Sequence, residues 1–190
     1  MTLANPPTRF TPEDLLHLEK DGVFELVDGR LLEKPMSFLA NKTAGIIIRR
    51  LADFAEKTHA GDVVPEQGFQ CFPHDPELVR RPDVAFVTAP RAAQIPDEGH
   101  VRIPPDIAIE VISPGNTINE FEEKRLDYRK AGIPLVWEVN PRFRFIQVYR
   151  LDHRPERLEE TDTITGEPVL PGFSILVQEL LPPADKRAAK

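Results

Sequence analysis

The segment PDIAIEVISP, residues 105–114, decides the fold, because it reads as one buried β-strand with a single acid in its interior. Two isoleucines and a valine at odd-numbered positions share one face of such a strand, and Glu110 lies on the other. An ionised carboxylate in an apolar strand is costly unless a cation or a metal pairs with it. Glu110 therefore marks either a structural ion pair, with Arg81 or Arg102 as its partner, or a functional site.

A second acid, Asp83, opens another apolar run at residues 83–87. If the two strands are neighbours, Asp83 and Glu110 meet, and two adjacent carboxylates repel unless a divalent cation or a shared proton lies between them. The alternative is that Asp83 only caps the turn after Pro82.

A lysine follows on the next predicted helix. Thr117 and Glu120 form a capping box at the start of residues 118–131. Lys124 falls in the more apolar arc of this helix, so its ammonium must reach water or find an anion. Glu110, one short loop upstream, is the natural partner, and a plain structural salt bridge is the alternative.

The rest of the chain predicts a mixed α/β sheet with helices on its faces. Its elements are a short helix from Thr11 to about Lys20, a hairpin of residues 24–27 and 30–33 around Asp28-Gly29, a helix at 37–59 stopped by Gly61, strands at 63–72, 135–139 and 143–149, a turn at 73–76, and an edge strand near 175–177. We expect a single domain over residues 1–190, with a core at about 10–180.

The composition of the chain excludes several classes of protein. The 190 residues carry 24 Lys plus Arg against 31 Asp plus Glu, a net charge of −7, which argues against coating nucleic acid non-specifically. The single cysteine, Cys71, excludes an internal disulfide and a Cys-rich zinc site. No apolar run approaches the roughly 20 residues of a membrane span, and no signal peptide is evident. We therefore expect a soluble, cytoplasmic protein.

Several segments together resemble a known family. They are RPDV at 81–84, PDIAIEVISP at 105–114, Glu123-Lys124, Tyr128, AGIP at 131–134, VWEVNP at 136–141, FELVDGR at 24–30 and LPGF at 170–173. The pattern is similar to the Uma-type putative restriction endonucleases of the PD-(D/E)XK nuclease superfamily, over most of the chain. The resemblance implies a restriction-endonuclease-like core, a central mixed sheet flanked by helices, with an N-terminal β-hairpin.

The resemblance also implies a chemistry. Asp83 and Glu110, with the backbone carbonyl of Val111, match the ligands of Mg²⁺ or Mn²⁺, and Glu25 matches a further acid of the site. Lys124 would orient the attacking water during hydrolysis of a DNA phosphodiester bond. Candidate contacts to DNA phosphates are Arg49, Arg50, Arg80, Arg81 and Arg102.

The chain departs from the family pattern at two positions. Ile112 stands where the superfamily has a lysine two residues after the second acid, so Lys124 is the replacement from the following helix. Asn41 stands where many members of the family have a histidine near the start of the long helix.

Two hypotheses of function follow, with a third behind them. The first is a metal-dependent DNA endonuclease, and the second is a catalytically silent nuclease fold that binds DNA or a protein. A two-carboxylate glycosidase is the third, and a lysine beside the acids suits phosphate chemistry better. The apolar strands at 135–139 and 143–149 also predict a homodimer.

Overall fold

The computed structural model describes residues 9–18, 22–35 and 37–184 of the chain. Its elements are α1 (Pro12–Leu18), β1 (Phe24–Val27), β2 (Arg30–Glu33), α2 (Phe38–Thr58), β3 (Gly61–Pro65), β4 (Val84–Thr88), α3 (Ala89–Ala92), β5 (Ile107–Val111), α4 (Ile118–Lys130), β6 (Leu135–Asn140), β7 (Phe145–Arg150), β8 (Glu156–Glu159), β9 (Thr163–Gly166), β10 (Leu170–Leu176) and the 3₁₀-helix η1 (Val177–Leu180).

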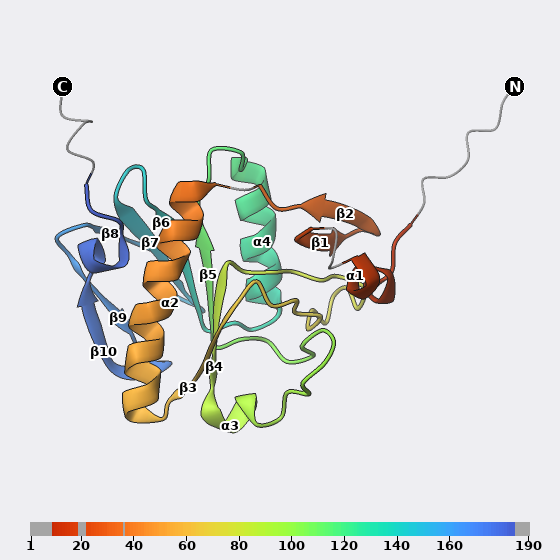
Figure 1. Ribbon diagram of the computed structural model, residues 1–190, viewed down its shortest axis with the longest axis horizontal. Helices are drawn as coiled ribbons and strands as arrows, with labels where there is room; N and C mark the ends of the chain where they lie inside the picture. The colour runs from red at the N-terminus through yellow and green to blue at the C-terminus, as the bar shows by residue number, and fades with distance from the viewer. Residues whose placement is uncertain (1–8, 19–21, 36, 185–190) are drawn as a thin grey trace, which may run out of the picture.

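A six-stranded mixed sheet lies at the centre, with strand order β3-β4-β5-β6-β7-β8 (Figure 1). Only β5 and β6 run parallel, joined through α4, and the other neighbours are antiparallel. The predicted mixed α/β fold is confirmed. The predicted hairpin around Asp28-Gly29 is also present, as a separate two-stranded sheet of β1 and β2.

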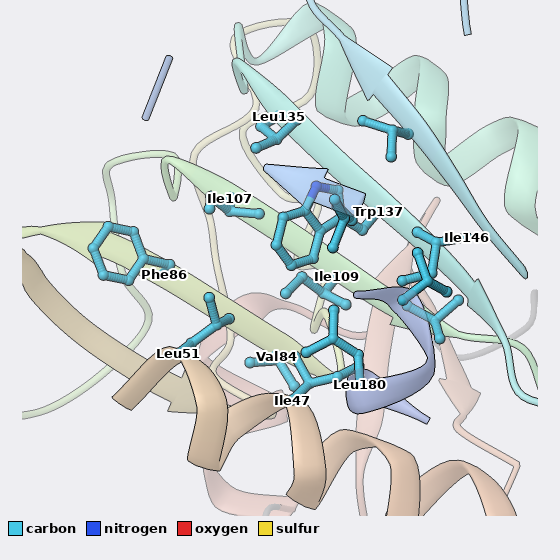
Figure 2. Close-up of a cluster of buried hydrophobic side chains, with 14 of the residues drawn as sticks. Ile47, Leu51, Val84, Phe86, Ile107, Ile109, Leu135, Trp137, Ile146 and Leu180 are labelled. Carbon is cyan, nitrogen blue, oxygen red and sulfur yellow. The ribbon is translucent and has the colours of Figure 1, made fainter. Parts of the chain in front are cut away.

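One face of the sheet packs against α2. Ile107 and Ile109 of β5 and Trp137 of β6 belong to this cluster, together with Ile47 and Leu51 of the helix (Figure 2). All five are fully buried. The odd-numbered positions of β5 therefore face the larger hydrophobic cluster, as their alternation predicts.

The opposite face of the sheet packs against α4. Ala108 and Val136 meet Tyr128 of the helix and Ile133 beyond it. Thr117 caps α4 through the predicted capping box with Glu120. This packing fixes the face of β5 on which the even-numbered residues lie, and it turns Glu110 toward α4.

Two details around β3 differ from the prediction. His59, with φ 54°, makes the left-handed cap of α2, in place of Gly61. The strand predicted at 63–72 ends at Pro65, because Glu66 takes a left-handed conformation (φ 50°) that turns the chain out of the sheet. Beyond this bend only Phe69 makes isolated bridges, to Arg80 and Val101.

The C-terminal region also differs from the prediction. The tail forms β10, which pairs with β9 in a second two-stranded sheet and is not an edge strand of the main one. The sequence did not reveal β8 and β9, since a polar strand such as ERLE at 156–159 has little apolar alternation. Phe173 of β10 stacks on Trp137 with ring centroids 6.2 Å apart, so this hairpin covers the same sheet face as α2.

The packing within the chain buries most of the apolar surface from which a homodimer is predicted. Trp137, Ile146 and Val148, which the sequence analysis assigns to an excess apolar surface, are fully buried within the chain. Phe143, in the turn between β6 and β7, is 67% exposed. The homodimer stays a prediction, without the support of a large apolar sheet face.

No helix in the described part of the chain combines the length and the hydropathy that a membrane crossing requires.

Cys71 gives a first testable prediction. Its side chain packs against two apolar clusters, and burial raises the pKa of the thiol to about 12. Because the thiolate is the reactive form, we expect a disulfide reagent at pH 8 to modify the native protein at least about tenfold more slowly than the urea-unfolded chain. Equal rates in the two states would show that Cys71 is accessible and ionised.

Candidate metal centre

A cavity of about 140 Å³ lies between the β1–β2 hairpin, the start of α2, α4 and the ends of β4 and β5. Six residues predicted from the sequence line it, namely Glu25, Arg80, Asp83, Glu110, Val111 and Lys124. Asn41, the residue in the place of the family's histidine, also lines the cavity. The fold therefore brings the predicted acids and the lysine into one site.

Asp83 and Glu110 are connected through the backbone of β5. Asp83 immediately precedes β4, which pairs antiparallel with β5. Its Oδ2 atom accepts a hydrogen bond from the backbone N–H of Val111 at 2.5 Å. This N–H belongs to the peptide bond between Glu110 and Val111. The carboxylate of Asp83 is therefore bound to the backbone directly beside Glu110.

Glu110 is buried and binds two groups of α4. Lys124 Nζ lies 3.1 Å from its Oε2 atom, and the Tyr128 hydroxyl donates to its Oε1 atom at 2.5 Å. Burial raises the pKa of Glu110 to about 7; Lys124 opposes this shift and the nearby Asp83 adds to it. Neither Arg81 nor Arg102, the partners considered from the sequence, forms this pair.

Glu25 lies on β1 and faces the same lysine. Its Oε1 atom is 2.9 Å from Lys124 Nζ and accepts from the backbone N–H of Arg81 at 2.9 Å, while its Oε2 atom accepts from Arg80 at 3.0 Å. Burial opposes ionisation, but Lys124 and Arg80 outweigh it and hold the pKa of Glu25 down at about 2. The pKa values of the two carboxyl groups that hold Lys124 are thus shifted in opposite directions, down for Glu25 and up for Glu110.

The sequence analysis missed Lys34 and Glu66. Lys34 Nζ lies 2.6 Å from Asp83 Oδ1 and 2.8 Å from Glu66 Oε2, and it donates to the carbonyl of Arg81 at 2.7 Å. Lys34 follows β2 and Glu66 follows β3, and neither belongs to a motif or a periodic face. No signal in the sequence pointed to them.

Two of the five arginines proposed as phosphate contacts are buried. Arg80 lines the cavity, but it is 3% exposed and its guanidinium binds Glu25 and Asp127. Arg81 is 8% exposed and donates to the carbonyl of Glu66. Both guanidinium groups thus already bind groups of the protein, and their contacts to phosphates stay a prediction.

The other three arginines do not line the cavity. Arg49 and Arg50 lie on α2, where Arg50 pairs with Glu179 at 3.3 Å, and Arg102 is exposed. Their contacts to phosphates stay a prediction, and any such contact lies outside the cavity.

Whether the site fits a divalent cation depends on its donor set. Within the ranges that the structure describes, no three His, Cys, Asp or Glu side chains converge on one point. Mg²⁺ does not need three, since it keeps several waters and binds through one or two carboxylates. Asp83 and Glu110 supply two carboxylates, and these hard oxygen donors suit such an ion. The donor chemistry therefore fits, with the ammonium of Lys34 currently lying on Asp83.

Comparisons with known proteins show the fold and the family of the chain. The chain has the fold of a putative nuclease belonging to DUF820 from Anabaena variabilis, with a TM-score of 0.76 and 18% sequence identity, over 90% of this chain and 97% of that one. A family model described as Uma2, putative restriction endonuclease, matches residues 12–178. The chain belongs to this family, as its sequence pattern indicates. A search of curated proteins found no match.

Proposed function

We propose that this protein is a metal-dependent endonuclease that hydrolyses phosphodiester bonds in DNA. The observation that carries the proposal is the connection of Asp83, Val111 and Glu110, with Lys124 bound to Glu110 in the same cavity. Asp83 and Glu110 would hold Mg²⁺ or Mn²⁺, together with the carbonyl of Val111. A bound ion of this kind stabilises negative charge on the phosphate and activates a water molecule.

The chain's own residues have separate tasks in this proposal. Glu25 and Glu110 hold the Lys124 ammonium at 2.9 and 3.1 Å and so fix its position. An ammonium has three N–H donors, and among the described residues that of Lys124 donates one hydrogen bond, to Glu110, and forms an ion pair with Glu25. A donor is then available to a substrate oxygen or the attacking water. Tyr128 orients Glu110 by its hydrogen bond.

Lys124→Met is expected to slow DNA cleavage by about a hundredfold or more, because the ammonium stabilises charge that develops mainly in the transition state. DNA affinity should change little. The measurement is supercoiled-plasmid nicking in Mg²⁺ and Mn²⁺, with a melting curve for each variant. A purely structural lysine would give the opposite result, lower stability with cleavage per folded molecule retained.

A catalytically silent fold that binds DNA or a protein is the second candidate. It is favoured by Ile112, which occupies the position of the superfamily's strand lysine, and by the ion pairs that already neutralise Asp83 and Glu110.

Plasmid nicking by the wild-type protein decides between the two candidates. We expect nicking with millimolar Mg²⁺ or Mn²⁺, none with EDTA, and none by Glu110→Ala. Binding of DNA without cleavage in either metal would reject the endonuclease and support the silent fold.

A further inference from the structure

Lys34 is the least expected residue of the site, and its ammonium has no spare donor. Its side chain is 12% exposed, and its three N–H groups meet Asp83 Oδ1, Glu66 Oε2 and the Arg81 carbonyl. Lys124 contrasts with it, since among the described residues its ammonium donates a hydrogen bond to Glu110 and otherwise forms only an ion pair, with Glu25. One lysine of the site is thus fully satisfied by the protein, and the other retains a donor.

Lys34 is surrounded by carboxylates, as a small bound cation would be. Burial opposes its charge, but Asp83, Glu110, Glu66 and Glu25 together raise its pKa well above the ordinary value. The acids around the ammonium therefore favour its charged form. Two of these four acids, Asp83 and Glu110, are also the ligands of the divalent ion in the proposed function.

Lys34 and a divalent ion therefore compete for the carboxylate of Asp83. Asp83 Oδ2 takes the Val111 N–H at 2.5 Å, and Lys34 lies on the other oxygen, Oδ1, at 2.6 Å. An ion bound to Asp83 would lie close to this ammonium, and two like charges at short range in a poorly solvated site repel strongly. The lysine stem is long and flexible enough to turn away, while its backbone N–H stays bonded to the Val23 carbonyl at 3.0 Å.

We propose that Lys34 is a built-in counter-ion that occupies the cation position of the metal-free protein and leaves Asp83 when a divalent ion binds. This inference rests on the proposed function, because it concerns the same metal site. Lys34 keeps the acids neutralised before the ion arrives, and it sets the affinity for the ion by competing with it. Because Lys34 extends from β2, loading of the site also loosens the contact between the hairpin and Asp83.

The test compares Mn²⁺ binding by calorimetry in the wild type, Lys34→Met, Lys34→Arg and Lys57→Met. Lys34→Met keeps an apolar stem without the charge, so we expect it to bind Mn²⁺ about tenfold or more tightly and to melt at a lower temperature without metal. Lys34→Arg keeps the competing charge and should bind no more tightly than the wild type. Lys57, exposed near the far end of α2, controls for the loss of one positive charge.

Equal or weaker Mn²⁺ binding by Lys34→Met would overturn the role of Lys34 and leave the metal site standing. No binding by any of the proteins would reject both the role and the proposed function. A measurement on the wild type covers the case in which Lys34→Met does not fold. Mg²⁺ should speed modification of Lys34 by an amine reagent, read by mass spectrometry, with Lys57 unchanged. An unchanged or slower modification of Lys34 would also overturn the proposal.

Discussion

Asp83→Asn and Glu110→Gln are each expected to reduce plasmid nicking by about a thousandfold or more. Both changes keep the shape of the side chain and remove one negative charge from the proposed ligand pair. A lost metal ion removes several kcal/mol of transition-state stabilisation, which corresponds to a rate loss of this size. Thermal melts should agree, since millimolar Mn²⁺ should stabilise the wild type and neither variant.

Glu56→Gln is the matched control for these variants. It removes one exposed carboxylate near the end of α2 opposite to the cavity, so it should nick DNA and respond to Mn²⁺ like the wild type. Melting curves of Asp83→Asn and Glu110→Gln without metal show whether each variant is folded. A folded variant that does not respond to Mn²⁺ has lost a ligand of the ion. Equal stabilisation of the wild type and both variants by Mn²⁺ would show that Asp83 and Glu110 do not bind the ion.

Arg80→Met is expected to lower the free energy of unfolding by about 3–5 kcal/mol, the usual cost of breaking a buried ion pair. The Arg80 side chain is 3% exposed, and it bonds Glu25 at 3.0 Å and Asp127 at 2.7 and 2.9 Å. Methionine fills much of its volume but removes the cation that binds both of these buried acids. Urea denaturation followed by the fluorescence of Trp137, the only tryptophan and fully buried, measures the change.

An exposed ion pair gives the comparison for Arg80. Arg9 pairs with Glu77 at 3.1 Å, with the two side chains 69% and 48% exposed. Arg9→Met should therefore cost less than about 1 kcal/mol, as exposed pairs generally do. If Arg80→Met costs no more than Arg9→Met, the buried network of Arg80, Glu25 and Asp127 does not stabilise the fold.

The elements with strong local signals could be predicted from the sequence. The Asp28-Gly29 hairpin, the capping box at Thr117 and the alternation in residues 105–114 each depend on neighbouring residues, and the structure contains all three. The prediction fails where the local signal is weak. The polar strand β8 has almost no apolar alternation, and the bend at Glu66 depends on the packing of distant segments.

Some residues of the candidate site could likewise be predicted from the sequence, and others could not. Asp83, Glu110 and Lys124 were found because charged residues in apolar patterns are costly and therefore conspicuous. Lys34 and Glu66 lie just outside strands, where charged residues are ordinary, so nothing distinguishes them in the sequence. The arginines show the converse case, because composition identifies basic residues but not their burial, and Arg80 and Arg81 are buried.

The sequence by itself determined the fold class, the face of β5 that carries Glu110 and the arc of α4 that carries Lys124. Periodicity, caps and turns act over a few residues, and these short-range effects are enough for such predictions. Only the tertiary structure decided which basic side chain forms an ion pair with each acid. Lys34 and Asp83 are 49 residues apart, and Arg80 and Glu25 are 55 apart. Their contacts depend on how the hairpin docks on the sheet, and no short-range pattern specifies that docking.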